Sequence, residues 1–133
     1  MNRPETQRGV RELCVAGAVA ALAYHVHNAL AVLGVRPVSL PFINPLEDYD
    51  PWLTFAFQFV GAFIDLLVLA SVGSLRFPWK PHPNWFNLTL SGVVDAICGG
   101  TLGSVLIIAA GVLTILEHGL HAHSASPRQS EGE

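Results

Sequence analysis

Charged residues are scarce in this chain. They make up 13% of the 133 residues, whereas a soluble domain carries about 25%. Apolar residues make up 51%, and the mean hydropathy is +0.45. A soluble chain of this length could not bury so much apolar surface in one core. The scarcity of charge therefore argues against an ordinary soluble domain and favours a protein that faces lipid.

A basic surface is missing as well. Seven Lys and Arg residues against ten Asp and Glu residues give a net charge of −3. Nucleic-acid binding requires a basic face, so we expect no nucleic-acid partner. The two cysteines, Cys14 and Cys98, have no Cys-x-x-Cys or metal-finger spacing, and we expect both to be reduced and structural.

The sequence also lacks the common motifs of soluble catalysis. It contains no nucleotide-binding loop, no Gly-x-Ser-x-Gly and no His-Glu-x-x-His. A non-enzymatic function is therefore favoured, and no resident cofactor is predicted.

Three long stretches with few charged residues account for most of the chain. Residues 13–35 carry no fixed charge, residues 51–75 carry only Asp65, and residues 81–116 carry only Asp95. A spanning helix needs about 20 apolar residues, and in lipid the backbone must satisfy its own hydrogen bonds. The pattern predicts an all-α integral membrane protein with three transmembrane helices, over residues 10–35, 52–75 and 87–121.

The third stretch is too long for a simple span. A helix that continued to residue 122 would be about 54 Å long, against about 30 Å of hydrocarbon. We expect this helix to tilt, to kink near Gly99–Gly100 or to project from the bilayer. Two spans in this stretch are the less favoured alternative, because no turn of adequate length separates two full apolar runs.

The remaining segments fix the expected organisation. Residues 1–123 form one transmembrane domain, and the short polar tail 124–133 is expected to be disordered. Ala21-Leu22-Ala23 resembles a signal-peptidase site, but the apolar run continues to Val35, which favours a retained first helix.

Basic residues indicate the orientation. They precede the first helix and lie between the second and third (Arg3, Arg8, Arg11, Arg76 and Lys80). By the positive-inside rule the N-terminus is predicted to be cytoplasmic and the C-terminus outside, in a plasma (inner) membrane.

Small residues recur along the third helix. They stand four residues apart in two adjacent series (Gly92, Ala96, Gly100 and Ser104; Gly99 and Gly103). Such spacing lets helix backbones approach closely in lipid. It predicts packing within the chain, or contact with a second copy or with other membrane subunits.

Polar residues within the apolar stretches are candidate functional residues, because ionisable groups are costly at bilayer depth. The candidates are His25, Asn28, Gln58, Asp65 and Asp95. His25 and Asp65 each lie near the middle of their helices, and these helices run antiparallel, so we expect a His25–Asp65 hydrogen bond. Asp95 is expected at the midplane or, if the apolar stretch 93–116 is centred, near the cytoplasmic edge, and the second placement is favoured.

A second cluster lies at the end of the third helix. Its members could converge on one copper or zinc ion (Glu117, His118, His121 and His123). The alternative is a helix end whose dipole favours histidine. His25 is also the best candidate for a haem ligand, but the second helix offers no matching histidine.

These features leave three functions open. The first is a small accessory subunit or homo-oligomer, for which packing matters most. The second is a proton-coupled transporter or channel subunit that uses His25, Asp65 and Asp95. The third is a haem- or metal-binding redox component.

Overall fold

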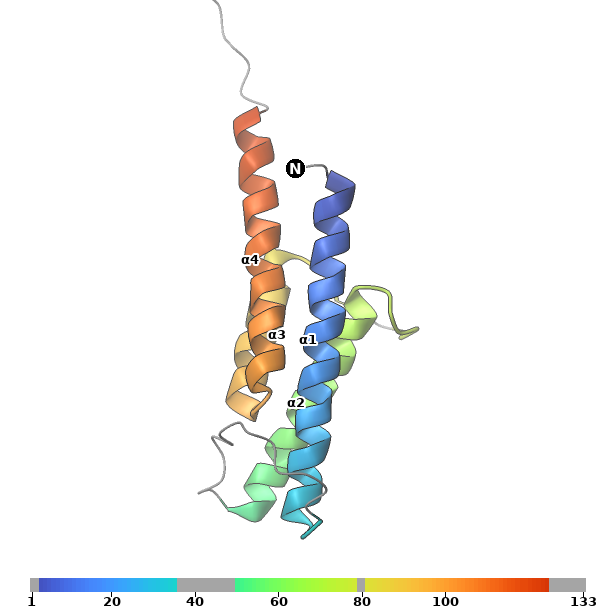
Figure 1. The fold of residues 1–133 in the computed structure, drawn as a ribbon, viewed down its shortest axis with the longest axis vertical. Coiled ribbons are helices and arrows are strands. Elements are labelled where there is room, and N and C mark those ends of the chain that lie inside the picture. The colour runs from blue at the N-terminus through green and yellow to red at the C-terminus, as the bar shows by residue number, and fades with distance from the viewer. Residues whose placement is uncertain (1–2, 36–49, 79–80, 125–133) are drawn as a thin grey trace, which may run out of the picture.

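The computed structural model describes residues 3–35, 50–78 and 81–124, with their side chains except at 3, 4, 118 and 120–124. Within these ranges the chain forms an elongated bundle of four α-helices (Figure 1). They are α1 (Arg3–Val32), α2 (Pro51–Ser71), α3 (Trp85–Cys98) and α4 (Thr101–Ser124). The all-α class is confirmed. Apart from Ser124, the predicted polar tail lies outside the described residues.

Two of these helices are long and apolar enough to cross a membrane. They are α1, over Glu5–Val32, and α2, and the criterion is length and composition alone. The core helix of a soluble protein or a signal sequence can have the same length and composition. The apolar parts of α3 and α4 are shorter, at Trp85–Cys98 and Thr101–Glu117.

Side-chain caps fix where two of the helices begin. The Asp50 carboxylate accepts hydrogen bonds from the backbone N–H groups of Trp52 (2.9 Å) and Leu53 (3.2 Å), and Pro51 occupies the first turn of α2. Asn84 likewise accepts a bond from the backbone N–H of Asn87, at 2.8 Å, at the start of α3. These caps satisfy N–H groups that the first turn of a helix leaves without partners.

The single helix predicted over 87–121 is wrong, because the chain reverses direction at Gly99–Gly100. Gly99 ends α3 with φ of +102°, a left-handed conformation that glycine adopts without strain. The next residue but one, Thr101, also has a positive φ, of +33°. The position of the bend agrees with the kink predicted near Gly99–Gly100, but the chain reverses there, because a much shorter connection than expected suffices.

After the reversal, α3 and α4 form an antiparallel hairpin. A methyl group added at Gly92 would meet the backbone of Ser104 and Ile108, and one at Gly111 would meet Thr89 and the backbone of α3. Glycine at these positions allows the two helix backbones to lie in direct contact.

The first and last helices, α1 and α4, are also antiparallel. Gly9 lies next to Leu113, and Gly17 lies next to Gly103 and Ile107. The start of α1 and the end of α4 therefore lie at the same end of the bundle (Figure 1). The sequence predicts that the two chain ends lie on opposite sides of a membrane. In the bundle, however, the start of α1 and the end of α4 are at the same end.

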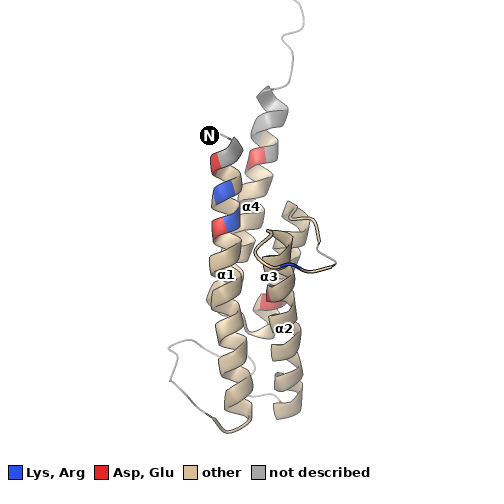
Figure 2. Cartoon of the chain, turned by 90° about the vertical axis from the view of Figure 1, so that its right-hand side faces the viewer, with Lys and Arg blue, Asp and Glu red and all other residues tan. Residues whose placement is uncertain are grey.

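Charged side chains gather at this end, which we call the chain-end side. Figure 2 shows the charged positions of α1 and α4 together there. Arg8 and Glu12 form an exposed ion pair at 2.8 Å on α1, and Glu117 belongs to α4. The opposite end of the bundle, where α1 ends and α2 begins, is called the connection side below.

The buried interior is divided along the bundle axis. Towards the chain-end side it is mainly apolar (Val10, Cys14, Ala18, Val68, Leu69, Leu88, Ile107 and Ala110), and the second free, buried cysteine, Cys98, lies at the turn beside the polar residues. Towards the connection side it is polar (His25, Asn28, Thr54, Gln58, Asp65 and Asp95). The fold thus gathers most of its buried polar groups in one half, whereas Thr6 and Thr114 are buried in the other.

Gly103 sets how closely α1 and α4 approach. A methyl group there would collide with the backbone of Gly17 and of Ala21, neither of which can move independently of α1. We expect Gly103→Ala to lower the free energy of unfolding by about 1–3 kcal/mol through overpacking.

The matched control is Gly119→Ala. Nothing lies within 4 Å of a methyl group at this helical position. Alanine is a better helix former than glycine by up to about 1 kcal/mol, so this variant is expected to keep or gain stability. The midpoints of thermal unfolding measured by circular dichroism decide the matter, and equal midpoints for the two variants would contradict the close α1–α4 contact.

Candidate functional site

Two stripes of buried residues bring polar side chains to the centre of the bundle. On α1 the stripe runs through Ala21, His25 and Asn28, and on α2 through Gln58, Gly61 and Asp65. Residues spaced three or four apart share one helix face. Since α1 and α2 are antiparallel, these stripes meet.

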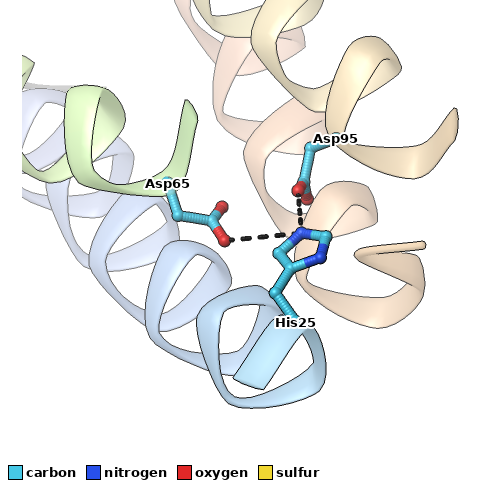
Figure 3. Close-up of side chains that lie close together, drawn as sticks. All are labelled: His25, Asp65 and Asp95. Carbon is cyan, nitrogen blue, oxygen red and sulfur yellow. Dashed lines mark hydrogen bonds and ion pairs between the residues drawn. The ribbon is translucent and has the colours of Figure 1, made fainter. Parts of the chain in front are cut away.

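His25 is the centre of the site. One ring nitrogen, Nδ1, lies 2.7 Å from Oε1 of Gln58, and the other, Nε2, lies 2.6 Å from Oδ1 of Asp95. Nε2 is also 3.7 Å from Oδ2 of Asp65 (Figure 3). The side chains of His25, Asp65 and Asp95 are fully buried. We call these three residues the His–Asp cluster.

Gln58 fixes the proton on one side of the ring. Its amide Nε2 donates to the backbone carbonyl of Cys98 at 3.1 Å, so its Oε1 is the atom that faces His25. An amide oxygen only accepts, and therefore Nδ1 of His25 must carry a proton and donate it. The link between Nε2 and Asp95 then holds one further proton, on the ring or on the carboxyl group.

Asp95 is held from three directions. Besides His25, the hydroxyl of Ser104 donates to its Oδ2 at 2.7 Å. The carboxyl group also lies against Gly100, directly before the first turn of α4. The positive end of a helix dipole favours negative charge at this point. Asp95 is thus held by contacts from both α1 and α4.

Asp65 has none of this support. It is 0% exposed, and among the described residues neither of its carboxyl oxygens has a hydrogen-bond partner. Buried polar atoms without partners are rare in folded proteins and call for a specific explanation. The two carboxyl groups of the cluster therefore sit in opposite environments, one satisfied and one not.

The structure brings together the polar residues that the sequence singled out. His25, Gln58, Asp65 and Asp95 are in contact, and the Asn28 amide lies 3.7 Å from the position of a methyl group at Gly99. The expected His25–Asp65 pair is present only as an ion-pair distance, because Asp95 takes the hydrogen bond. Asp95 lies level with His25 in the bundle, and its depth in a membrane stays a prediction.

Sequence reasoning assigned Ser104 to helix packing and missed its contact with Asp95. Asp95 lies four residues before Gly99 and Ser104 four residues after Gly100, so a reversal at that pair places them opposite each other. The spacing was readable in the sequence, but only with a turn in place of a kink.

The other small residues are used mainly within the chain. Gly92, Gly99, Gly100 and Gly103 are buried in the hairpin or against α1, whereas Ala96 is exposed. In the part of the chain that the structure describes, the close-packing faces predicted from the sequence are therefore largely covered by the chain's own helices.

A metal ion is a second way to occupy the site. The ligand atoms of His25, Asp65 and Asp95 lie within 4.8 Å of one another. Two ligand atoms on one zinc ion are separated by about 3.4 Å, given bond lengths near 2.1 Å. The 2.6 Å between His25 and Asp95 is too short for this and matches a shared proton.

Neither a haem nor the predicted outer metal site gains support. Both nitrogens of His25 are engaged in hydrogen bonds, and a methyl group at Gly61 would collide with its ring, so the ring is tightly enclosed. Of the four residues of the outer cluster only the side chain of Glu117 is described, and those of His118, His121 and His123 lie outside the described residues.

Comparison with known proteins gives no match to a family model, to a curated protein or to a solved structure. The function must therefore be argued from the chemistry of the His–Asp cluster.

The two carboxyl groups should differ in their effect on stability. Asp95→Ala leaves both the Ser104 hydroxyl and His25 Nε2 without their partner, and such unsatisfied groups cost about 1–3 kcal/mol each. Asp65→Ala removes no hydrogen bond. We expect Asp95→Ala to lower the free energy of unfolding by at least about 2 kcal/mol more than Asp65→Ala. Chemical denaturation of both variants measures this difference, and the reverse order would refute the assigned hydrogen bonds.

Proposed function

We propose that this chain is an integral membrane protein in which the His–Asp cluster binds and releases a proton. Each helix exposes large apolar side chains, among them Val19, Phe59, Ile97 and Val105, all more than half exposed. A soluble monomer rarely exposes contiguous apolar surface of this extent. Lipid is the solvent that such a surface requires.

We further propose that α1 and α2 span the bilayer while α3 and α4 enter it as a hairpin. At 1.5 Å per residue, the 14-residue α3 is about 21 Å long, which is shorter than the roughly 30 Å hydrocarbon core. The outer half of α4 lies beside the charged start of α1, which belongs in water. The hairpin thus replaces the third span expected from the sequence. Its buried turn is acceptable because irregular backbone within a membrane must be covered by protein.

With α3 and α4 arranged as a hairpin, the excess of basic residues on one side of the membrane, which sets the orientation of the chain, becomes larger. Six of the seven basic residues occur in α1, between α2 and α3, or after α4 (Arg3, Arg8, Arg11, Arg76, Lys80 and Arg128), and only Arg36 occurs between α1 and α2. The chain-end side is therefore proposed to be cytoplasmic, and the connection side to face out of the cell across the plasma (inner) membrane.

A membrane location makes a direct prediction for the purified protein. We expect the chain to be monodisperse only in detergent or lipid, because the apolar outer faces of α1 and α2 would otherwise associate. Size-exclusion chromatography with light scattering tests this. A monodisperse, helical chain in plain buffer without detergent would rule out the membrane assignment.

The single observation that carries the proton-binding proposal is the unpartnered carboxyl group of Asp65. Two protons already reside on the ring nitrogens of His25 or in its bond to Asp95, which makes that pair neutral overall. An ionised Asp65 would leave one negative charge buried without a hydrogen bond, a state that is strongly disfavoured. One bound proton removes that charge.

A purely structural role explains this arrangement less well. Buried polar networks that only fix helix register are expected to be fully satisfied, because a partly satisfied network costs stability. Here Gln58, His25, Asp95 and Ser104 form such a satisfied network, and Asp65 stands beside it without a bond. Ionisable groups of this kind within membranes serve proton relays and transport.

We therefore favour a proton-coupled carrier or channel subunit over the accessory-subunit or homo-oligomer function. The latter relied on small residues free to meet a partner, and most of these are covered within the chain. It stays a prediction without a specific supporting contact.

The bound proton can be detected spectroscopically. We expect the infrared spectrum of the reconstituted protein at neutral pH to contain the C=O stretching band of a protonated carboxylic acid, which Asp65→Asn abolishes. In reconstituted vesicles, we expect Asp65→Asn and His25→Gln each to reduce pH-driven proton flux by at least about tenfold. This change is equivalent to about 1.4 kcal/mol.

The matched control is Glu12→Gln, which removes an exposed carboxylate on α1 outside the cluster. It should change neither the band nor the flux. If Asp65→Asn removes no carboxylic-acid band, or if no such band is present, the proposed proton site does not exist.

A further inference from the structure

The His–Asp cluster is not equally far from both sides of the bundle. It lies in the polar half of the interior, with Asn28 one turn further along α1 and Thr54 one turn before Gln58 on α2. Both of these residues are buried and both lie towards the connection side. Polar groups therefore continue from the cluster in that direction.

The turn between α3 and α4 lies at the level of the His–Asp cluster. Gly99 lies against the amides of Gln58 and Asn28, so α3 and α4 turn back beside the cluster. In the part of the chain that is described, only α1 and α2 continue beyond this turn, to Val32 and from Pro51. Among the described residues, the cluster is thus flanked by α1 and α2 on this side, whereas α3 and α4 also lie beside it on the other.

The opposite direction is closed by apolar packing. Behind Asp65 and Asp95 the helices place aliphatic side chains in contact across the whole interior (Ala18, Val68, Leu69, Leu88, Ile107 and Ala110). These six residues are at most 7% exposed and carry no polar side-chain atoms, so the layer that they form offers water no side-chain hydrogen-bond partners.

We infer that, in the conformation of this structure, the His–Asp cluster exchanges its proton with the connection side only, along Thr54, Asn28 and Gln58, while the apolar core blocks exchange with the chain-end side; transport would then require a second conformation that opens to the chain-end side. This inference rests on the proposed proton site and adds the side of access to it. In the proposed orientation the accessible side is outside the cell. Asp50, which caps α2, places a carboxylate at the entrance, where negative charge attracts cations.

The exchange itself is a simple acid–base step. A hydronium ion on the connection side gives its proton to an oxygen of Asp65, which leaves water and a neutral carboxylic acid, and release is the reverse. The titratable groups that face Asp65 are His25 from α1 and both Asp95 and Cys98 from α3. From α4 only the uncharged Ser104 reaches the cluster, through Asp95, and among the described residues of α2 no further charged group does.

One-sided access can be tested on the full chain in vesicles of a single orientation. We follow the carboxylic-acid band of Asp65 after a pH jump applied separately to each side of the membrane. The band is expected to respond at once to the connection side and, on the same timescale, not to the chain-end side.

Substitutions along the route give the second readout. Asn28→Leu combined with Thr54→Val should slow the response by at least about tenfold, the change expected from an added barrier of about 1.4 kcal/mol. The equilibrium amplitude of the band should stay unchanged, which shows that the fold and the site persist. Thr114→Val is the matched control, since Thr114 is an equally buried threonine in the apolar half, bonded to the Ala110 carbonyl.

The outcomes separate this inference from the proposed function. Absence of the band altogether would remove the proton site itself. A band that responds equally to both sides, or faster to the chain-end side, would overturn one-sided access while the proton site stands. An unchanged rate in Asn28→Leu/Thr54→Val would overturn the route.

Discussion

The imidazole ring of His25 is the point at which all four helices meet. It belongs to α1, and its Nδ1 donates a hydrogen bond to Gln58 of α2. Its Nε2 is hydrogen-bonded to Asp95 of α3, which in turn accepts a hydrogen bond from Ser104 of α4. Hydrogen bonds are directional, so these contacts can form together only in one register of the helices. Apolar packing between smooth helices in lipid sets register poorly, because lipid offers little incentive for one apolar contact over another. The geometry of one side chain therefore determines the arrangement of the bundle.

The same arrangement explains why Asp65 can remain unsatisfied. The network around His25 already holds α1, α2 and the hairpin together, so the bundle does not depend on a bond from Asp65. Folded proteins can tolerate a costly group at a functional site when neighbouring contacts supply the stability. Asp95 and Asp65 thus divide two tasks between them. Asp95 is held by hydrogen bonds that fix the structure, and Asp65 is the group that we propose to change its protonation state.

Much of the fold and of the candidate site could be predicted from the sequence, and the incorrect predictions share one cause. Periodicity identified the buried faces of α1 and α2, and the rarity of charge in the apolar stretches singled out His25, Asp65 and Asp95. The error lay at Gly99–Gly100, where local apolarity is continuous and gives no sign that the chain reverses. Whether two glycines kink a helix or end it depends on what the following helix packs against. That contact, between Gly103 and Gly17, is separated by more than 80 residues and has no local signature.

In the membrane arrangement that we propose, the short length of α3 has a consequence for biosynthesis. A 14-residue helix that carries Asp95 cannot be inserted stably as an independent segment, because it neither crosses the hydrocarbon nor hides its carboxyl group. It can enter the membrane only together with α4, and only once the polar faces of α1 and α2 are present to receive it. The chain order meets this requirement, since the ribosome completes the receiving pair before the hairpin emerges. In this arrangement, α3 and α4 therefore join the bundle only after α1 and α2 have been inserted.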